Sequence, residues 1–171
     1  MITITDKQIE KAISRIEKMT EAKYEKFFED FGAKQPELFG YILAYSDEIQ
    51  SDAARDEFIF IMSVIWDCYN GLKLGLDPVQ KRDITRLEKV QLKEWEKLNA
   101  IKDPEEDEAF VVKFITQPAL WAFMTETAIP DPKKPNKTNF SADEDFAILY
   151  STTKLVCSLL DEKVKKAELK N

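Results

Sequence analysis

A short helical pattern occurs twice in this chain. Residues 27–43 read FFEDFGAKQPELFGYIL and residues 110–124 read FVVKFITQPALWAFM, so each copy contains Phe-x-x-x-Phe followed by Gln-Pro-x-Leu. An apolar segment that carries one of the two cysteines, Cys68 or Cys157, follows each copy. Because repeated units bury their apolar faces against one another, a duplication of this kind constrains the chain to an array of related helices.

The fold expected from this pattern is all-α, with about eight helices in two pseudo-repeated four-helix halves that form one compact helical bundle or array. Residues 1–171 are expected to form a single domain, with halves at residues 5–71 and 83–168 linked by residues 72–82. The chain has only 4 glycines, which favours helices because few positions can adopt positive φ at low cost. The alternative is that Gln-Pro is simply a common helix opening, and that alternative leaves the helix count unchanged.

Sequence signals mark the first three helices. Thr5 with Gln8 forms a capping box, in which each side chain satisfies a backbone amide of the first turn. Gly32 is expected to end the second helix, since glycine adopts the left-handed conformation that closes many helices. Pro36 suits the first turn of the third helix, where its missing amide hydrogen costs nothing.

The fourth helix is expected to be the buried centre of the first half. Ser51 or Asp52 caps it, and Gly71 follows its last residue, Asn70. Between these ends, residues 58–66 are apolar almost all round the helix. A helix without a polar face is normally surrounded by other elements.

The second half repeats this order, with helix starts expected near residues 83, 103, 118 and 143. Ser141 with Glu144 forms the capping box of the last helix. Its final residues, 161–171, are rich in charge and are expected to fray. The acidic clusters at residues 105–108 and 143–145 both lie at helix starts, where carboxylates favour the positive end of the helix dipole.

Composition and charge exclude several classes of protein. The net charge of −7 makes nucleic-acid binding a poor candidate, because that affinity depends on basic residues that displace counterions. The first residues, MITITDKQIEK, do not resemble a secretory signal, and no apolar run reaches the roughly 20 residues of a membrane span. Two cysteines within apolar helices are typical of reduced thiols in the cytoplasm, so we expect a cytoplasmic protein.

The absence of histidine removes most familiar catalytic and metal sites. It excludes Ser-His-Asp and Cys-His catalysis, zinc sites that contain histidine, and di-iron sites built on Glu-x-x-His. No C-x-x-C pair, phosphate-binding loop or dinucleotide-binding glycine motif is present. The sequence therefore indicates neither a catalytic residue nor a cofactor or metal site, and it favours a protein that is not an enzyme.

Three polar residues inside apolar helices form the candidate polar site. Asp67 follows Trp66 in the fourth helix, and a buried carboxylate is costly unless it is paired or hydrogen-bonded. The alternative is that Asp67 faces solvent or pairs with a lysine or arginine. Ser63 matches Thr152 when the cysteines are aligned; their hydroxyls either bond to a carbonyl one turn earlier or line a polar pocket between the halves.

The three tryptophans, Trp66, Trp95 and Trp121, are candidate anchors for an interaction. Tryptophan is enriched among the residues that dominate protein interfaces. The alternative is that each is a packing residue of the helical core.

The function expected from these patterns is that of a small cytoplasmic, non-enzymatic adaptor that binds another protein. Its acidic composition suits a protein that masks a basic partner, as immunity proteins and antitoxins do, although this is an analogy of composition rather than a shared motif. The alternative is a carboxylate-dependent Mg²⁺ or Mn²⁺ hydrolase, or a small-ligand-binding protein, centred on Asp67. A third hypothesis is a homodimer in which exposed aromatic residues of the Gln-Pro helices bury one another.

Overall fold

The protein is an assembly of helices. A computed structural model describes residues 2–102, 116–128, 140 and 143–170. Within these ranges there is no strand, and the helices are α1 (Asp6–Glu17), α2 (Glu21–Lys34), α3 (Pro36–Glu48), α4 (Asp52–Asn70), α5 (Lys81–Ala100), α7 (Pro118–Ala128) and α8 (Asp143–Glu168). The helix expected at residues 103–115 and the cap expected at Ser141 lie outside the described residues.

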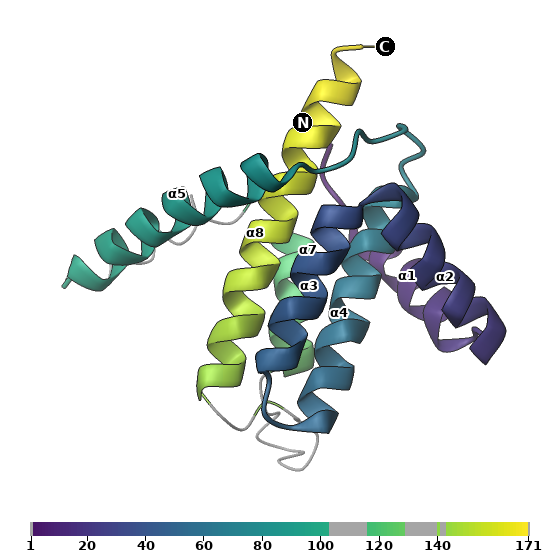
Figure 1. Ribbon diagram of the computed structural model, residues 1–171, viewed down its shortest axis with the longest axis horizontal. Helices are drawn as coiled ribbons and strands as arrows, with labels where there is room; N and C mark the ends of the chain where they lie inside the picture. The colour runs from purple at the N-terminus through teal and green to yellow at the C-terminus, as the bar shows by residue number, and fades with distance from the viewer. Residues whose placement is uncertain (1, 103–115, 129–139, 141–142, 171) are drawn as a thin grey trace.

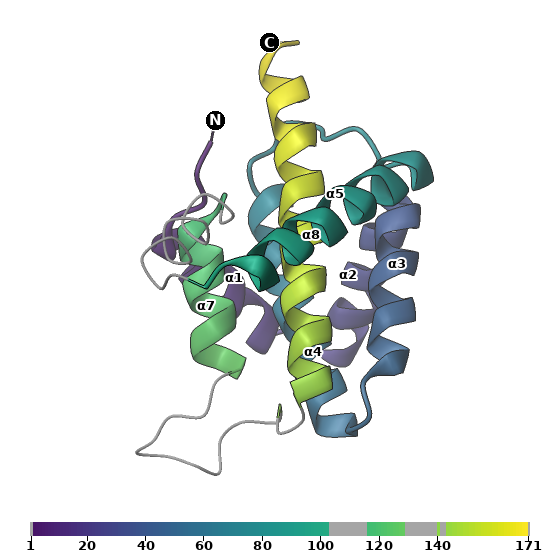
Figure 2. The same cartoon turned by 90° about the vertical axis from the view of Figure 1, so that its left-hand side faces the viewer.

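Two long helices, α4 and α8, form the centre of the molecule. They contact each other, and α3 packs against both of them (Figure 1). On the outside, α1 packs on α4 and on α7, while α5 crosses α8 at a steep angle (Figure 2). Every residue of α4 from Ile61 to Tyr69 is buried, which confirms that its apolar surface is covered on all sides.

Three of the expected helix starts are confirmed. Thr5 and Gln8 form the capping box of α1. Pro36 lies in the first turn of α3. The hydroxyl of Ser51 accepts a hydrogen bond from the Ala54 amide at 3.1 Å, which fixes the start of α4. These local signals are reliable because each acts within one turn: the Thr5 and Ser51 side chains belong to caps, and the fixed φ of Pro36 suits the first helical position.

Gly32 does not end the second helix, contrary to the sequence prediction. Helix α2 continues through it to Lys34. A Cβ atom at Gly32 would lie 3.2 Å from Cδ1 of the Phe39 ring, so the missing side chain gives room for α2 to approach α3. This glycine serves packing rather than helix termination.

The prediction that residues 161–171 fray is wrong for most of that segment. Helix α8 runs to Glu168, and Asp161, Lys163 and Val164 are all buried. The Lys163 ammonium lies 2.9 Å from a carboxylate oxygen of Asp83 at the start of α5. A charged segment can pack when its charges meet partners on another helix, and the sequence of one helix does not show those partners.

A buried glutamine joins the first half to the segment before α5. Gln35, the residue before α3, has no exposed surface. Its side-chain oxygen accepts a hydrogen bond from the Val79 amide at 2.8 Å, and its side-chain nitrogen donates to the Asp77 carbonyl at 3.4 Å. The extended segment that leads into α5 is therefore held by the start of α3.

A second buried glutamine, from the later part of the chain, makes the same kind of contact with the segment before α1. Gln117, the residue before α7, accepts a hydrogen bond from the Ile4 amide at 2.9 Å and donates to the Ile2 carbonyl at 3.2 Å. It also donates to Oδ1 of Asp161 at 2.7 Å, and the Tyr69 hydroxyl donates to that same oxygen at 2.7 Å. The segment that leads into α1 is thus held by the start of α7.

Candidate functional site

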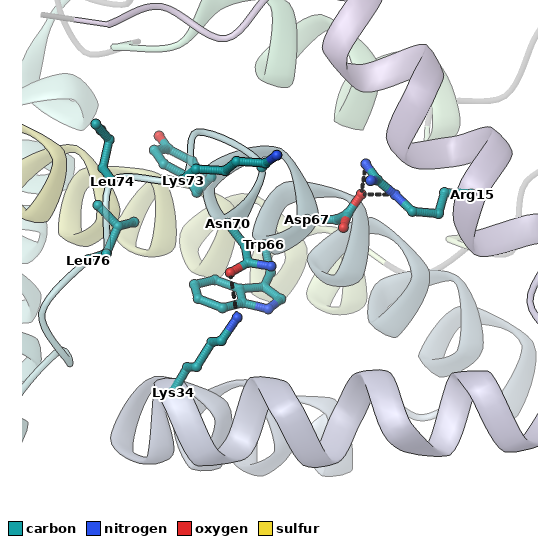
Figure 3. A pocket seen from close by; sticks show the side chains of 11 residues that line it. Arg15, Lys34, Trp66, Asp67, Asn70, Lys73, Leu74 and Leu76 are labelled. Carbon is teal, nitrogen blue, oxygen red and sulfur yellow. Dashed lines mark hydrogen bonds and ion pairs between the residues drawn. The ribbon is translucent and has the colours of Figure 1, made fainter.

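A cavity of about 580 Å³ lies at the carboxyl-terminal end of α4 (Figure 3). Its volume falls within the range of small-molecule sites, roughly 300 to 1,000 Å³. Helices α1, α2 and α4 and the loop after α4 supply its described lining residues, which are Arg15, Lys34, Trp66, Asp67, Tyr69, Asn70, Gly71, Lys73, Leu74, Gly75 and Leu76.

Asp67 lies in this cavity, and its carboxylate is both buried and paired. The residue is only 6% exposed. The Arg15 guanidinium contacts its Oδ2 atom through Nε at 3.0 Å and through a terminal nitrogen at 2.6 Å. Burial raises the pKa of Asp67, and the neighbouring Arg15 charge opposes that rise. Arg15 therefore supplies the partner that a carboxylate at this position requires.

Two lysines add positive charge to the cavity walls. Lys34 donates to Oδ1 of Asn70 at 2.9 Å. Lys73 adopts a positive φ of 55°, unlike any other non-glycine residue in the described part of the chain. In Figure 3 the Lys73 ammonium points toward the Arg15–Asp67 pair, while Lys34 reaches in from the opposite wall. The carboxyl-terminal end of α4 carries a partial negative charge that favours cations here. That partial charge of about half a unit is smaller than the combined charge of the arginine and the two lysines.

The other candidate polar residues lie elsewhere. The Ser63 hydroxyl donates to the Ile59 carbonyl at 2.7 Å, the backbone bond that one of the two interpretations expects. The buried Thr152 hydroxyl has no hydrogen-bond partner within the described part of the chain. Neither residue is among the described residues that line the Asp67 cavity. The structure therefore does not combine the three residues in that cavity.

The tryptophans differ in exposure. Trp66 is only 3% exposed and stacks on Phe31, with ring centroids 4.6 Å apart, so it packs in the core and offers no exposed anchor. Trp95 and Trp121 are half-buried. Both rings lie against Tyr150, at 5.1 Å and 4.3 Å between centroids.

An aromatic groove lies between α3, α5 and α8. It consists of two adjoining hollows of about 270 Å³ and about 430 Å³, and Trp95 and Ser151 line both of them. The described lining residues of the groove are Tyr41, Tyr45, Glu88, Gln91, Leu92, Trp95, Phe146, Ala147, Tyr150, Ser151 and Leu155. The tyrosines were not among the predicted site residues, although the spacing of Tyr41 and Tyr45 places them on one face of a helix.

Acidic side chains border this groove. Burial raises the pKa of Tyr41, and the neighbouring Tyr45 and the carboxylates of Glu88 and Glu48 raise it further. Leu92 is 61% exposed at the edge of the groove. The groove thus combines aromatic walls, an exposed apolar side chain and negative charge.

The described residues show little capacity for covalent or metal chemistry. Cys68 and Cys157 are both buried as free thiols. Burial raises the pKa of Cys68 to about 12 and also raises the pKa of Cys157, so neither thiol is activated as a nucleophile. Within the ranges that the structure covers, no group of three His, Cys, Asp or Glu residues is arranged to hold a metal ion.

Comparison of the chain with models of protein families, with curated proteins and with solved structures gives no match. Among the described helices, none combines the length and the apolar character needed to cross a membrane. The interpretation of the two hollows therefore depends on their own geometry and chemistry.

Proposed function

We propose that this protein is a non-enzymatic, cytoplasmic binding protein that engages another protein through the aromatic groove. The observation that carries the proposal is the groove itself, in which Tyr41, Tyr45 and Trp95 form apolar walls beside an exposed Leu92. Aromatic residues that surround a concave surface are typical of the centres of protein interfaces. Leu92, which is 61% exposed, adds apolar surface beside these rings that a partner could cover.

The chemistry of the groove indicates the kind of partner. Glu48 and Glu88 add negative charge beside Tyr41, and the whole chain carries a net charge of −7. A partner segment with apolar side chains along one face and lysine or arginine beside them would complement both features. An amphipathic, basic helix has this pattern, which agrees with the hypothesis that the protein masks a basic partner.

Two matched substitutions test this proposal. Leu92→Glu places a charge at the groove, whereas Leu169→Glu makes the same change at a terminal residue that is 88% exposed. Each tagged variant is used to capture proteins from the native lysate, and recovery is measured by quantitative mass spectrometry. We expect a partner that the wild type and Leu169→Glu recover in equal amounts and that Leu92→Glu recovers at about a tenth of that level or less.

A photo-crosslinking amino acid at position 92 gives an independent measurement. It should attach covalently to the same partner, while the same group at position 169 should not. Equal capture by both glutamate variants would contradict the proposal. Sedimentation of the purified chain tests the homodimer hypothesis, since self-association that Leu92→Glu abolishes would identify the partner as a second copy.

We also propose that the chain is an internal duplication of a four-helix unit, and the two glutamine contacts support this. Gln35 before α3 and Gln117 before α7 each bind an amide and the carbonyl two residues earlier. The amide belongs in one case to Val79, two residues before α5, and in the other to Ile4, two residues before α1. Under this proposal the second unit begins before Val79, earlier than the expected boundary at residue 83.

The pattern of burial supports the same proposal. When the glutamines are aligned, the buried positions of α3 fall on those of α7: Leu38 with Leu120, Ile42 with Met124 and Ser46 with Ala128. When Ile4 is aligned with Val79, two of the three buried positions of α1 fall on buried positions of α5: Ile9 with Ile84 and Ile16 with Gln91. Amphipathic helices generally bury residues at such spacings, so the support comes from the matching position of these residues relative to the two glutamine contacts.

A further inference from the structure

We propose that the cavity at the carboxyl-terminal end of α4 binds a small organic oxyanion, a carboxylate or a phosphate joined to a flat apolar group. This site is separate from the aromatic groove, and the proposal does not depend on a protein partner.

Positive charge exceeds negative charge among the described lining residues. Arg15, Lys34 and Lys73 are cationic, and Asp67 is the one carboxylate among them. These cations come from α1, from the end of α2 and from the loop after α4, so chain folding gathers them from three separate elements. An anion in the cavity would balance the excess charge.

The cations also keep donors for a ligand. The Arg15 contacts to Asp67 use Nε and one terminal nitrogen, and the guanidinium has five N–H groups in total. Lys34 is engaged with Asn70 through one hydrogen bond, and an ammonium group has three donors. Lys73 lines the same cavity as Arg15, and its ammonium points toward the Arg15–Asp67 pair in Figure 3. An oxyanion placed there would receive charge-assisted hydrogen bonds.

The remaining walls explain why the ligand should carry an apolar group. Trp66, Leu74 and Leu76 line the side of the cavity away from Arg15 (Figure 3). Leu74 and Leu76 are half-buried, so they retain apolar surface for a ligand to cover. A bare inorganic ion would fill only a small part of about 580 Å³. The positive φ of Lys73 is a further sign, because strained backbone often occurs where a loop shapes a binding site.

The glycines allow binding to be located by NMR. Of the 4 glycines in the chain, Gly71 and Gly75 line the cavity, whereas Gly32 and Gly40 do not. Protein labelled with ¹⁵N only at glycine therefore gives two reporters inside the site and two controls. The probes are benzoate and phenyl phosphate, with benzylamine as a ring of similar size and opposite charge.

We expect saturable shifts of the Gly71 and Gly75 signals with at least one of the two anions. A dissociation constant of about 0.1 to 1 mM is reasonable for probes of this size. The Gly32 and Gly40 signals should stay in place, and benzylamine should cause no saturable change. Benzoate alone, phenyl phosphate alone or both would support the proposal and would identify the oxyanion that the site accepts.

Variants with altered charge provide the second measurement. Lys34 and Lys73 are exposed at the cavity edge, so Lys34→Gln and Lys73→Gln should leave the fold intact. Each should weaken binding by about fivefold or more, whereas Lys23→Gln, at an exposed position on α2 outside the cavity, should not change it. The proposal is overturned if neither anion gives a saturable shift up to about 5 mM, if benzylamine binds equally well, or if the cavity variants bind like Lys23→Gln.

Discussion

The two buried glutamines make the same backbone contacts in surroundings that differ. Gln35 bonds only to the backbone of the segment before α5. Gln117 bonds to the backbone of the segment before α1 and also to Asp161, which in turn accepts a hydrogen bond from Tyr69. In both contacts the hydrogen bonds to the backbone fix how the leading segment enters its helix. The additional hydrogen bond from Gln117 to Asp161 connects the second contact to the core formed by α4 and α8.

The difference lies in Asp161, a buried carboxylate that only the Gln117 contact includes among the described residues. A buried carboxylate needs donors, and Oδ2 of Asp161 has no hydrogen-bond partner among the residues that the structure describes. Both donors to Asp161 reach its other oxygen. The second glutamine is therefore expected to matter more for stability, because its loss would deprive a buried carboxylate as well as a buried amide.

The largest expected effect follows from replacing each glutamine by leucine. Gln117→Leu removes the acceptor for the Ile4 amide and a donor to Asp161, so we expect the free energy of unfolding to fall by about 3 to 4 kcal/mol. Gln35→Leu removes only backbone contacts and should cost about 2 kcal/mol. Chemical denaturation of both variants gives the comparison, and a greater loss for Gln35→Leu would contradict the account.

Replacing Tyr69 by phenylalanine tests whether the hydrogen bonds to Asp161 are coupled to Gln117 and not to Gln35. We expect a loss of about 1 to 2 kcal/mol, since one of the two donors to Asp161 disappears. In a double-mutant cycle, Tyr69→Phe and Gln117→Leu should be non-additive by about 0.5 kcal/mol or more because they share Asp161. The effects of Tyr69→Phe and Gln35→Leu should be additive. Coupling energies of equal size in both cycles would contradict the expected difference between Gln117 and Gln35.

The capping boxes of α1 and α5 differ in charge and should differ in their response to pH. Gln8 occupies the third position of α1, and Asp83 occupies that of α5, where a hydrogen bond from Lys163 lowers the pKa of the Asp83 carboxyl. A carboxyl with a lowered pKa stabilises the fold above its ordinary pKa of about 3.9, and that stabilisation is lost as the pH falls through the folded value.

Asp83→Asn should therefore reduce the free energy of unfolding by about 1 to 2 kcal/mol near neutral pH. The difference from wild type should shrink in acid. Gln8→Ala, the matched change in the first capping box, should give a difference that does not vary with pH. Denaturation curves measured across the acidic range give the result, and parallel pH profiles for the two variants would contradict this part of the account.

The smallest expected effect concerns Asp67, which joins α4 to α1 through Arg15. Its counterpart when the cysteines are aligned is Val156, so this pair has no equivalent in the second half. Burial raises the pKa of Asp67, so the carboxyl contributes most to stability below its ordinary pKa, and this contribution is lost as the pH rises through the folded value.

Asp67→Asn should change stability at neutral pH by about 1 kcal/mol or less, since the burial cost and the Arg15 attraction oppose each other. Relative to this variant, the wild type should become more stable as the pH falls. A difference that stays constant with pH would show that the environment of Asp67 does not perturb its ionisation.

Features that depend on one helix were predictable from the sequence, and features that depend on several helices were not. The Thr5 capping box, the Pro36 start and the buried α4 follow from local pattern and are confirmed. The role of Gly32 depends on Phe39 of the next helix, which a rule for helix ends does not consider. The packing of the last turns of α8 depends on Asp83, far away in sequence.

The candidate site shows the same limit. Asp67 was singled out because a carboxylate is unusual in an apolar helix, and it does line a cavity. Arg15, Lys34 and Lys73 were missed because lysine and arginine on helix surfaces and in loops are common, and only the fold brings these three together. Trp66 was considered as an anchor from its residue type, but its stacking on Phe31 buries it.

The most direct test of the paired glutamine contacts is amide hydrogen exchange at Ile4 and Val79, measured by NMR. Both amides donate to a buried glutamine oxygen and should exchange slowly even though they lie outside helices. Gln117→Leu should reduce protection more at Ile4 than at Val79, and Gln35→Leu should do the reverse. Rapid exchange at both amides in the wild type, or equal losses at both sites in each variant, would contradict the account.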